Sequence, residues 1–157
     1  MKRSLAFIAI TVLAFACTGR VLAQNPLVGT WKLNVAKSKY SPGPAPKSMT
    51  RTVEADGDKV KYTFEGVAAD GSPVSFSYTV AYDGKDHPIT GAGPSGADAI
   101  SAKQSASGST EATFKKAGKP VLIAKVEVSA DGKVTTISQA SAPGAGSINN
   151  TLVYEKQ

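Results

Sequence analysis

Most of the chain alternates between apolar and polar residues, which is the period of a half-buried β-strand. In the clearest run, one face carries Val74, Phe76, Tyr78, Val80 and Tyr82. The pattern predicts ten strands, over 29–35, 48–55, 59–65, 74–82, 88–91, 98–105, 110–115, 121–129, 134–139 and 150–155. Because the part after residue 24 shows almost no helical period, we expect an all-β domain.

The connections between these strands are short and rich in glycine. Typical examples are Asp56-Gly57-Asp58, Asp70-Gly71-Ser72, Asp83-Gly84-Lys85 and Asp131-Gly132-Lys133. Such tripeptides form tight hairpins, which join antiparallel neighbours and leave no room for crossover helices. We therefore predict an up-and-down meander of about ten strands that closes into a barrel, since closure removes the unpaired sheet edges. A two-layer sandwich is the competing architecture and would need longer connections.

One connection breaks the pattern. Residues 36–47 contain three prolines among three lysines, at Lys37, Lys39 and Lys47. This composition is typical of an extended, solvated segment.

The first 23 residues have the features of a secretory signal peptide. A basic start at Lys2 and Arg3 precedes a twelve-residue apolar run, and the segment ends on Val21-Leu22-Ala23, which suits a signal peptidase. The run is too short to span a membrane. We expect residues 24–157 to be one exported domain, periplasmic or secreted. Lipid attachment at Cys17 is the less favoured alternative.

Composition excludes several kinds of site. The mature part has 15 basic and 12 acidic residues, a small excess that does not favour a nucleic-acid partner. The chain has one cysteine and one histidine, Cys17 and His87, so a disulfide framework and a zinc site built from these residue types are excluded. We expect no metal, no cofactor and no catalytic residue, and we interpret His87 as an exposed loop residue.

Both ends of the mature chain resemble the calycin barrels, the lipocalins and fatty-acid-binding proteins. Gly29-Thr30-Trp31 looks like the Gly-x-Trp of their first strand, and Tyr154-Glu155-Lys156 is similar to the closing strand of the fatty-acid-binding proteins. The mature chain as a whole resembles small secreted bacterial lipocalin-like domains. The resemblance implies a barrel with Trp31 at its closed end, where Gly29 and Trp31 have a structural role.

The resemblance also implies where a ligand carboxylate would bind. In the fatty-acid-binding proteins the last strand presents an Arg two residues before a Tyr, and this pair binds the carboxylate. In this chain Tyr154 matches the Tyr, but Leu152 stands at the position of the Arg. Lipocalins also place a late basic residue over the first-strand Trp. In this chain no Arg follows Arg51.

Six residues are the candidates for ligand binding: Arg51, Tyr62, Phe64, Phe76, Tyr78 and Tyr154. The four middle residues share the apolar parity of two strands, so they either line an internal pocket or fill the interior. Arg51 is in register with Met49 and Val53, and a charge on that face needs a partner. The alternatives for Arg51 are a structural ion pair, a position at the rim, or an anion site.

These observations favour a non-enzymatic, monomeric barrel that binds a small, mainly hydrophobic molecule. The alternative is a solid barrel that serves as a structural or interaction module of the cell envelope through the loop at 36–47. An enzyme is the third hypothesis, and a turnover that is lost in His87→Ala would support it.

Overall fold

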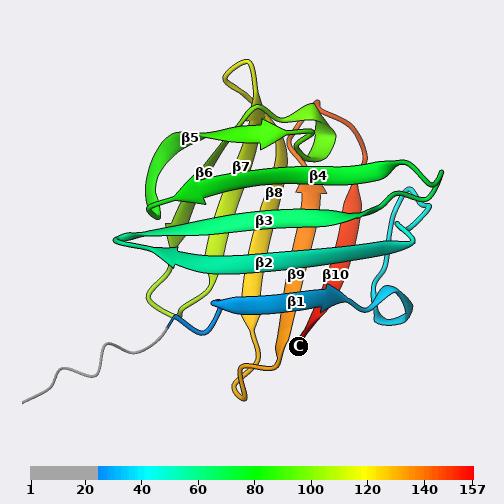
Figure 1. The fold of residues 1–157 in the computed structure, drawn as a ribbon. Coiled ribbons are helices and arrows are strands. Elements are labelled where there is room, and N and C mark those ends of the chain that lie inside the picture. The colour runs from blue at the N-terminus through cyan, green and yellow to red at the C-terminus, as the bar shows by residue number, and fades with distance from the viewer. Residues whose placement is uncertain (1–24) are drawn as a thin grey trace, which may run out of the picture.

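Ten antiparallel strands form a closed barrel in the computed structural model, which describes residues 25–157 (Figure 1). They are β1 (Gly29–Leu33), β2 (Ser48–Asp56), β3 (Lys59–Val67), β4 (Pro73–Val80), β5 (Asp83–Gly91), β6 (Ala99–Gln104), β7 (Thr110–Lys116), β8 (Lys119–Val128), β9 (Val134–Ser141) and β10 (Asn149–Lys156). Each strand pairs with the next, and β1 pairs with both β2 and β10. The predicted up-and-down meander barrel is confirmed, and the sandwich is wrong.

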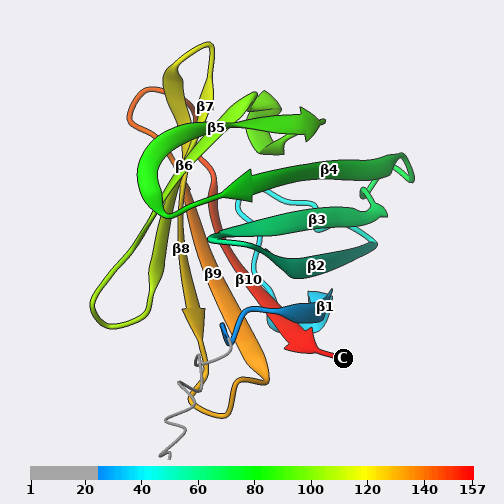
Figure 2. The ribbon, with the colours of Figure 1, turned by 60° about the vertical axis from the view of Figure 1, so that its left-hand side comes forward.

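Tight glycine turns and long ladders explain this topology. Gly57 has a φ of +63° in the turn between β2 and β3, a value that glycine adopts without steric cost. From this turn the ladder runs without interruption from Asp56 opposite Lys59 to Ser48 opposite Val67. Figure 2 shows that β1–β4 cross β8–β10 at a steep angle, so the two halves of the barrel face each other across one interior.

The predicted turn at residues 83–85 is wrong. β5 already begins at Asp83, and the connection from β4 is Ala81 and Tyr82, where Tyr82 has a φ of +49°. Gly84 lies within β5, at a register shift between Asp83 and Asp86. Glycine is typical of both β-bulges and tight turns, so a bulge inside a strand can look like a turn in the sequence. The fifth strand is therefore nine residues long, and its predicted start at residue 88 was too late.

The proline-rich connection is attached to the barrel. It begins with a short 3-10 helix, η1 (Val35–Lys37). Lys39 then forms an isolated bridge with Thr151 of β10, and the Asn149 amide donates to the Ser41 carbonyl at 2.7 Å. Most of the segment is exposed, as predicted, but Tyr40 is half-buried against the core.

The predicted signal peptide and the alternative lipidation at Cys17 lie outside the described residues. Within residues 25–157, no helix has the length and apolar character that a transmembrane span requires.

Candidate ligand-binding cavity

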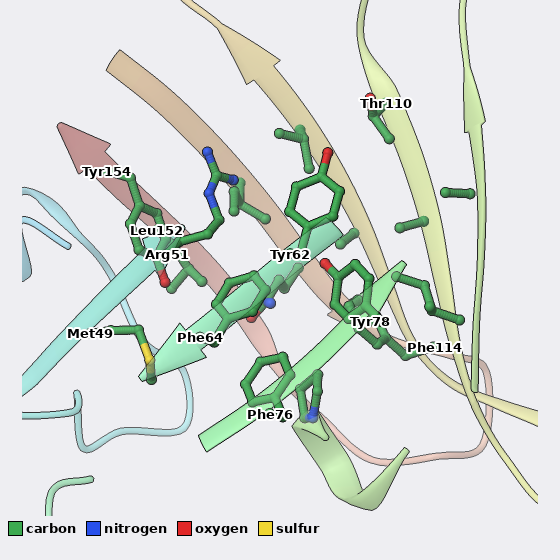
Figure 3. Close-up of a pocket in the computed structure, with 18 of the residues that line it drawn as sticks. Met49, Arg51, Tyr62, Phe64, Phe76, Tyr78, Thr110, Phe114, Leu152 and Tyr154 are labelled. Atoms are coloured by element: carbon green, nitrogen blue, oxygen red, sulfur yellow. The ribbon is translucent and has the colours of Figure 1, made fainter. Parts of the chain in front are cut away.

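The interior of the barrel contains a cavity of about 260 Å³ (Figure 3). Its wall consists mainly of aromatic and aliphatic side chains from eight of the strands, all but β1 and β5, and from their connections. Tyr40, Pro46, Met49, Ala92 and Pro94 surround one end, which we call the mouth. The interior is therefore hollow, and the hypothesis of a solid barrel is wrong.

One wall of the cavity is a cluster of aromatic rings from β3 and β4. Phe64 lies directly opposite Phe76 in the ladder, and their rings are stacked with centroids 4.5 Å apart. Tyr62 and Tyr78 form the neighbouring pair, at 5.1 Å, and Phe114 of β7 meets the Tyr78 ring edge-on at 6.1 Å. The register places these pairs on one face of the sheet, so their rings form a continuous apolar surface.

Arg51 also lines the cavity and is 1% exposed. Its Nη2 donates to Thr135 Oγ1 at 3.2 Å, and its guanidinium carbon is 5.2 Å from the centroids of both the Trp31 and the Tyr154 rings. No side chain of residues 25–157 forms an ion pair with Arg51. The two structural interpretations, an ion pair and a rim position, are therefore wrong, and the anion site stays a prediction.

Trp31 lies outside the cavity, between its two cross-strand partners Arg51 and Lys156. It is fully buried, and its Nε1 donates to the Leu27 carbonyl at 2.7 Å. The Lys156 ammonium is 5.2 Å from the Trp31 ring centroid. A Cβ at Gly29 would come within 2.8 Å of Lys156 Cε, so the glycine leaves room for the Lys156 side chain beside Trp31.

Several tyrosine side chains line the cavity and are partly or fully buried. Burial raises the pKa of Tyr78 and Tyr154, which the charge of Arg51 partly offsets. Burial also raises the pKa of Tyr62, whose hydroxyl is hydrogen-bonded to that of Tyr82, and it raises the pKa of Tyr40 to about 12. These phenols stay neutral at physiological pH and can donate hydrogen bonds to a ligand.

All six predicted ligand-binding residues line this one cavity: Arg51, Tyr62, Phe64, Phe76, Tyr78 and Tyr154. The sequence analysis missed Tyr40 and Thr110, which also line it. Tyr40 was hidden in a proline-rich segment, where no strand period marks an inward position. Thr110 begins β7 on the same face as Ala112 and Phe114, so parity alone identifies it.

His87 lies in β5 opposite Ile100, not in an exposed loop as predicted. Its Nε2 is 3.0 Å from Asp83 Oδ1, and its side chain is 16% exposed. Among the described residues, no group of three or more His, Cys, Asp or Glu side chains is placed to hold a metal ion.

Comparisons with known proteins identify the fold. No family model matches the chain, and no curated protein does. Among solved structures, the REP1-NXSQ fatty acid transporter is 14% identical, with a TM-score of 0.56 over 83% of this chain and 96% of its own. Zebrafish ileal bile acid-binding protein complexed with cholic acid is 13% identical over 84% and 99%, with a TM-score of 0.43. At these identities the likeness is one of fold.

Proposed function

We propose that the mature chain is a secreted or periplasmic, non-enzymatic binding protein that holds a small, mainly hydrophobic molecule inside its barrel. The observation that carries this proposal is the aromatic-walled cavity of about 260 Å³. Binding pockets for small molecules are concave and predominantly apolar, with a few polar groups that orient the ligand. Here the Arg51 guanidinium and the tyrosine hydroxyls are such groups.

The name of the structural relative supports the same class of ligand. That protein is a fatty acid transporter, and its fold covers most of this chain. Export rests on the signal-peptide pattern of residues 1–23. The mass of the exported protein tests this part, since cleavage after Ala23 leaves Gln24 as the first residue.

A neutral fluorophore tests ligand binding. N-phenyl-1-naphthylamine is compact and uncharged, and its emission increases in an apolar site. We expect the purified mature protein to bind one molecule of it per barrel. The substitution Ala124→Phe fills the cavity, because Ala124 is 3% exposed and lines it. Binding should therefore be lost in this variant.

Ala140→Phe is the matched control. Ala140 is exposed on β9, opposite Ile123, so the same added ring points to solvent. Equal emission from both variants, or no binding by the unmodified protein, would contradict the proposal.

A further inference from the structure

We propose that the ligand is a small organic carboxylate whose negatively charged head group is bound by Arg51, with its apolar body toward the mouth. This inference rests on the proposed function, because it names the class of molecule that the cavity holds. Three observations support it: a buried cation without an anionic partner among residues 25–157, polar groups gathered toward one end of the cavity, and positive charge around the mouth.

The first observation concerns the unsatisfied charge. A buried guanidinium is costly unless it is paired and hydrogen-bonded. All twelve Asp and Glu residues of the chain fall within the described part, and each is at least partly exposed. The Nε of Arg51 is buried and has no hydrogen-bond partner among residues 25–157. The side chain therefore retains both a charge and an N–H donor for an acceptor that the chain does not supply.

The second observation is the polarity of the cavity. Figure 3 shows the Arg51 guanidinium and the Tyr62 hydroxyl directed toward one end, whereas Met49 and Phe76 lie toward the other. In the register, Tyr62 pairs with Val53 near the β2–β3 turn, and Met49 lies at the other end of β2. Arg51 pairs with Phe64 in the middle of β2, and its guanidinium is directed toward the Tyr62 end (Figure 3). Thr110 Oγ1 is a second buried atom without a partner and belongs to the wall. An amphiphile would enter with its head group first.

The third observation is the charge at the mouth. The connections and strand ends on this side of the barrel carry four lysines and two aspartates: Lys39, Lys47, Lys116, Lys119, Asp70 and Asp98. Lys37 of the same connection is already paired with Glu155 at 2.8 Å. The turns and strand ends on the opposite side carry four aspartates and three lysines: Asp56, Asp58, Asp83, Asp131, Lys59, Lys85 and Lys133. The excess of positive charge is therefore at the mouth. A positive field at the entrance of a low-dielectric cavity increases the association rate of anions.

This site is not the one that the fatty-acid-binding resemblance implies. That resemblance places the Arg on β10, where this chain has Leu152, whereas Arg51 comes from β2. Arg51 and Tyr154 still meet, because β1 alone separates their strands in the barrel. A volume of about 260 Å³ lies below the usual range for drug-sized ligands, so the carboxylate has a compact body.

Paired carboxylates and amides of the same shape test the inference. We would titrate the mature protein by calorimetry with 2-naphthoate against 2-naphthamide, and with octanoate against octanamide. Each amide keeps the body of its acid and removes the charge. A hydrogen bond to a charged group corresponds to a roughly 10- to 100-fold change in affinity. We expect each carboxylate to bind more tightly than its amide by a factor in this range.

Three variants assign the preference to Arg51. Arg51→Met should remove the preference, with a larger loss of affinity for each carboxylate than for its amide, and Arg51→Lys should keep part of it. Lys61→Met removes one positive charge from an exposed side chain of β3, so this control should keep the full preference.

The two proposals fail in different ways. If all four compounds bind but each amide equals its carboxylate, or if Arg51→Met keeps the preference, the carboxylate inference is overturned and the proposed function stands. If none of the four compounds and no neutral fluorophore binds, both are overturned.

Discussion

Arg51 combines features that do not serve the stability of the empty barrel. Its guanidinium is buried, it makes one hydrogen bond, to Thr135, and it lies near the faces of Trp31 and Tyr154. Each cation–π contact contributes about 2 kcal/mol when desolvated. The effective cost of burying an ion without a counterion is several kcal/mol. We infer that the empty barrel is less stable than it would be with an apolar residue here.

Arg51→Met should therefore raise the free energy of unfolding of the ligand-free protein by about 1–3 kcal/mol. Methionine is flexible and fills much of the same space, so the cavity created is small. Urea unfolding of both proteins measures the change. A loss of more than about 1 kcal/mol would show that the aromatic contacts outweigh the desolvation penalty.

Trp31 has the opposite role, because it is fully buried and lies outside the cavity. Trp31→Ala should lower the free energy of unfolding by about 3–5 kcal/mol, and it leaves the Leu27 carbonyl without its donor. Phe76→Ala is the comparison, since Phe76 is half-buried and faces the cavity, and its cost should be about 1–2 kcal/mol. Thermal and urea unfolding measure both. Equal losses would contradict the separate roles of the two rings.

Among the strands, β4 and β5 form one of the two weakest seams of the barrel, the other being that between β1 and β10. They share three register pairs, whereas β3 and β4 share eight and β2 and β3 share nine. Gly91 lies at the end of this short ladder with a φ of +89°, and a Cβ there would come within 2.5 Å of the Ser75 carbonyl oxygen. The backbones approach closely where they do pair, but few hydrogen bonds hold them.

Amide hydrogen exchange should detect this seam. Local opening follows the number of hydrogen bonds that must break, so the β5 amides that face β4 should exchange roughly tenfold or more faster than those between β2 and β3. Nuclear magnetic resonance at neutral pH resolves the two groups. Uniform protection around the barrel would contradict the expectation and would mean that the barrel opens only as a unit.

At the scale of the whole molecule, the sequence predicts what depends on local periods. Alternation placed Tyr62, Phe64, Phe76 and Tyr78 on one face, and the structure brings all four to one cavity. The parity of β2 also directed Arg51 inward. These predictions succeed because a strand has a strict period of two, so a side chain's face follows from its position alone.

The contacts that arise when the barrel closes could not be predicted from the sequence. Lys156 covers Trp31 because β10 returns to β1, a contact between the two ends of the domain. Tyr40 reaches the cavity because its segment bridges to β10. Such contacts depend on which strands become neighbours, and a local pattern of prolines or charges carries no information about a partner far along the chain.

The buried tyrosines make the whole barrel sensitive to alkaline pH. Burial raises the pKa of Tyr40, Tyr62, Tyr78 and Tyr154 above the value of 10.0 for an unperturbed tyrosine. Above pH 10 the unfolded chain therefore binds fewer protons than the folded one, and the free energy of unfolding falls as the pH rises. Each fully buried phenol contributes a slope of at most about 1.4 kcal/mol per pH unit.

We expect the tyrosines to leave the free energy of unfolding, measured with urea, unchanged up to about pH 9. Between pH 10 and 12 this free energy should fall steeply. Tyr40→Phe should make this loss shallower, because the pKa of Tyr40 is raised to about 12 and its contribution disappears across that interval. Tyr154→Phe should do the same and extend the effect to higher pH, since Tyr154 is 3% exposed. Lys61→Met, which changes an exposed group of β3, is the control.

A free energy of unfolding that stays constant to pH 11 would mean that the phenols reach water in the folded state, and the cavity would then be wetter than its aromatic wall indicates.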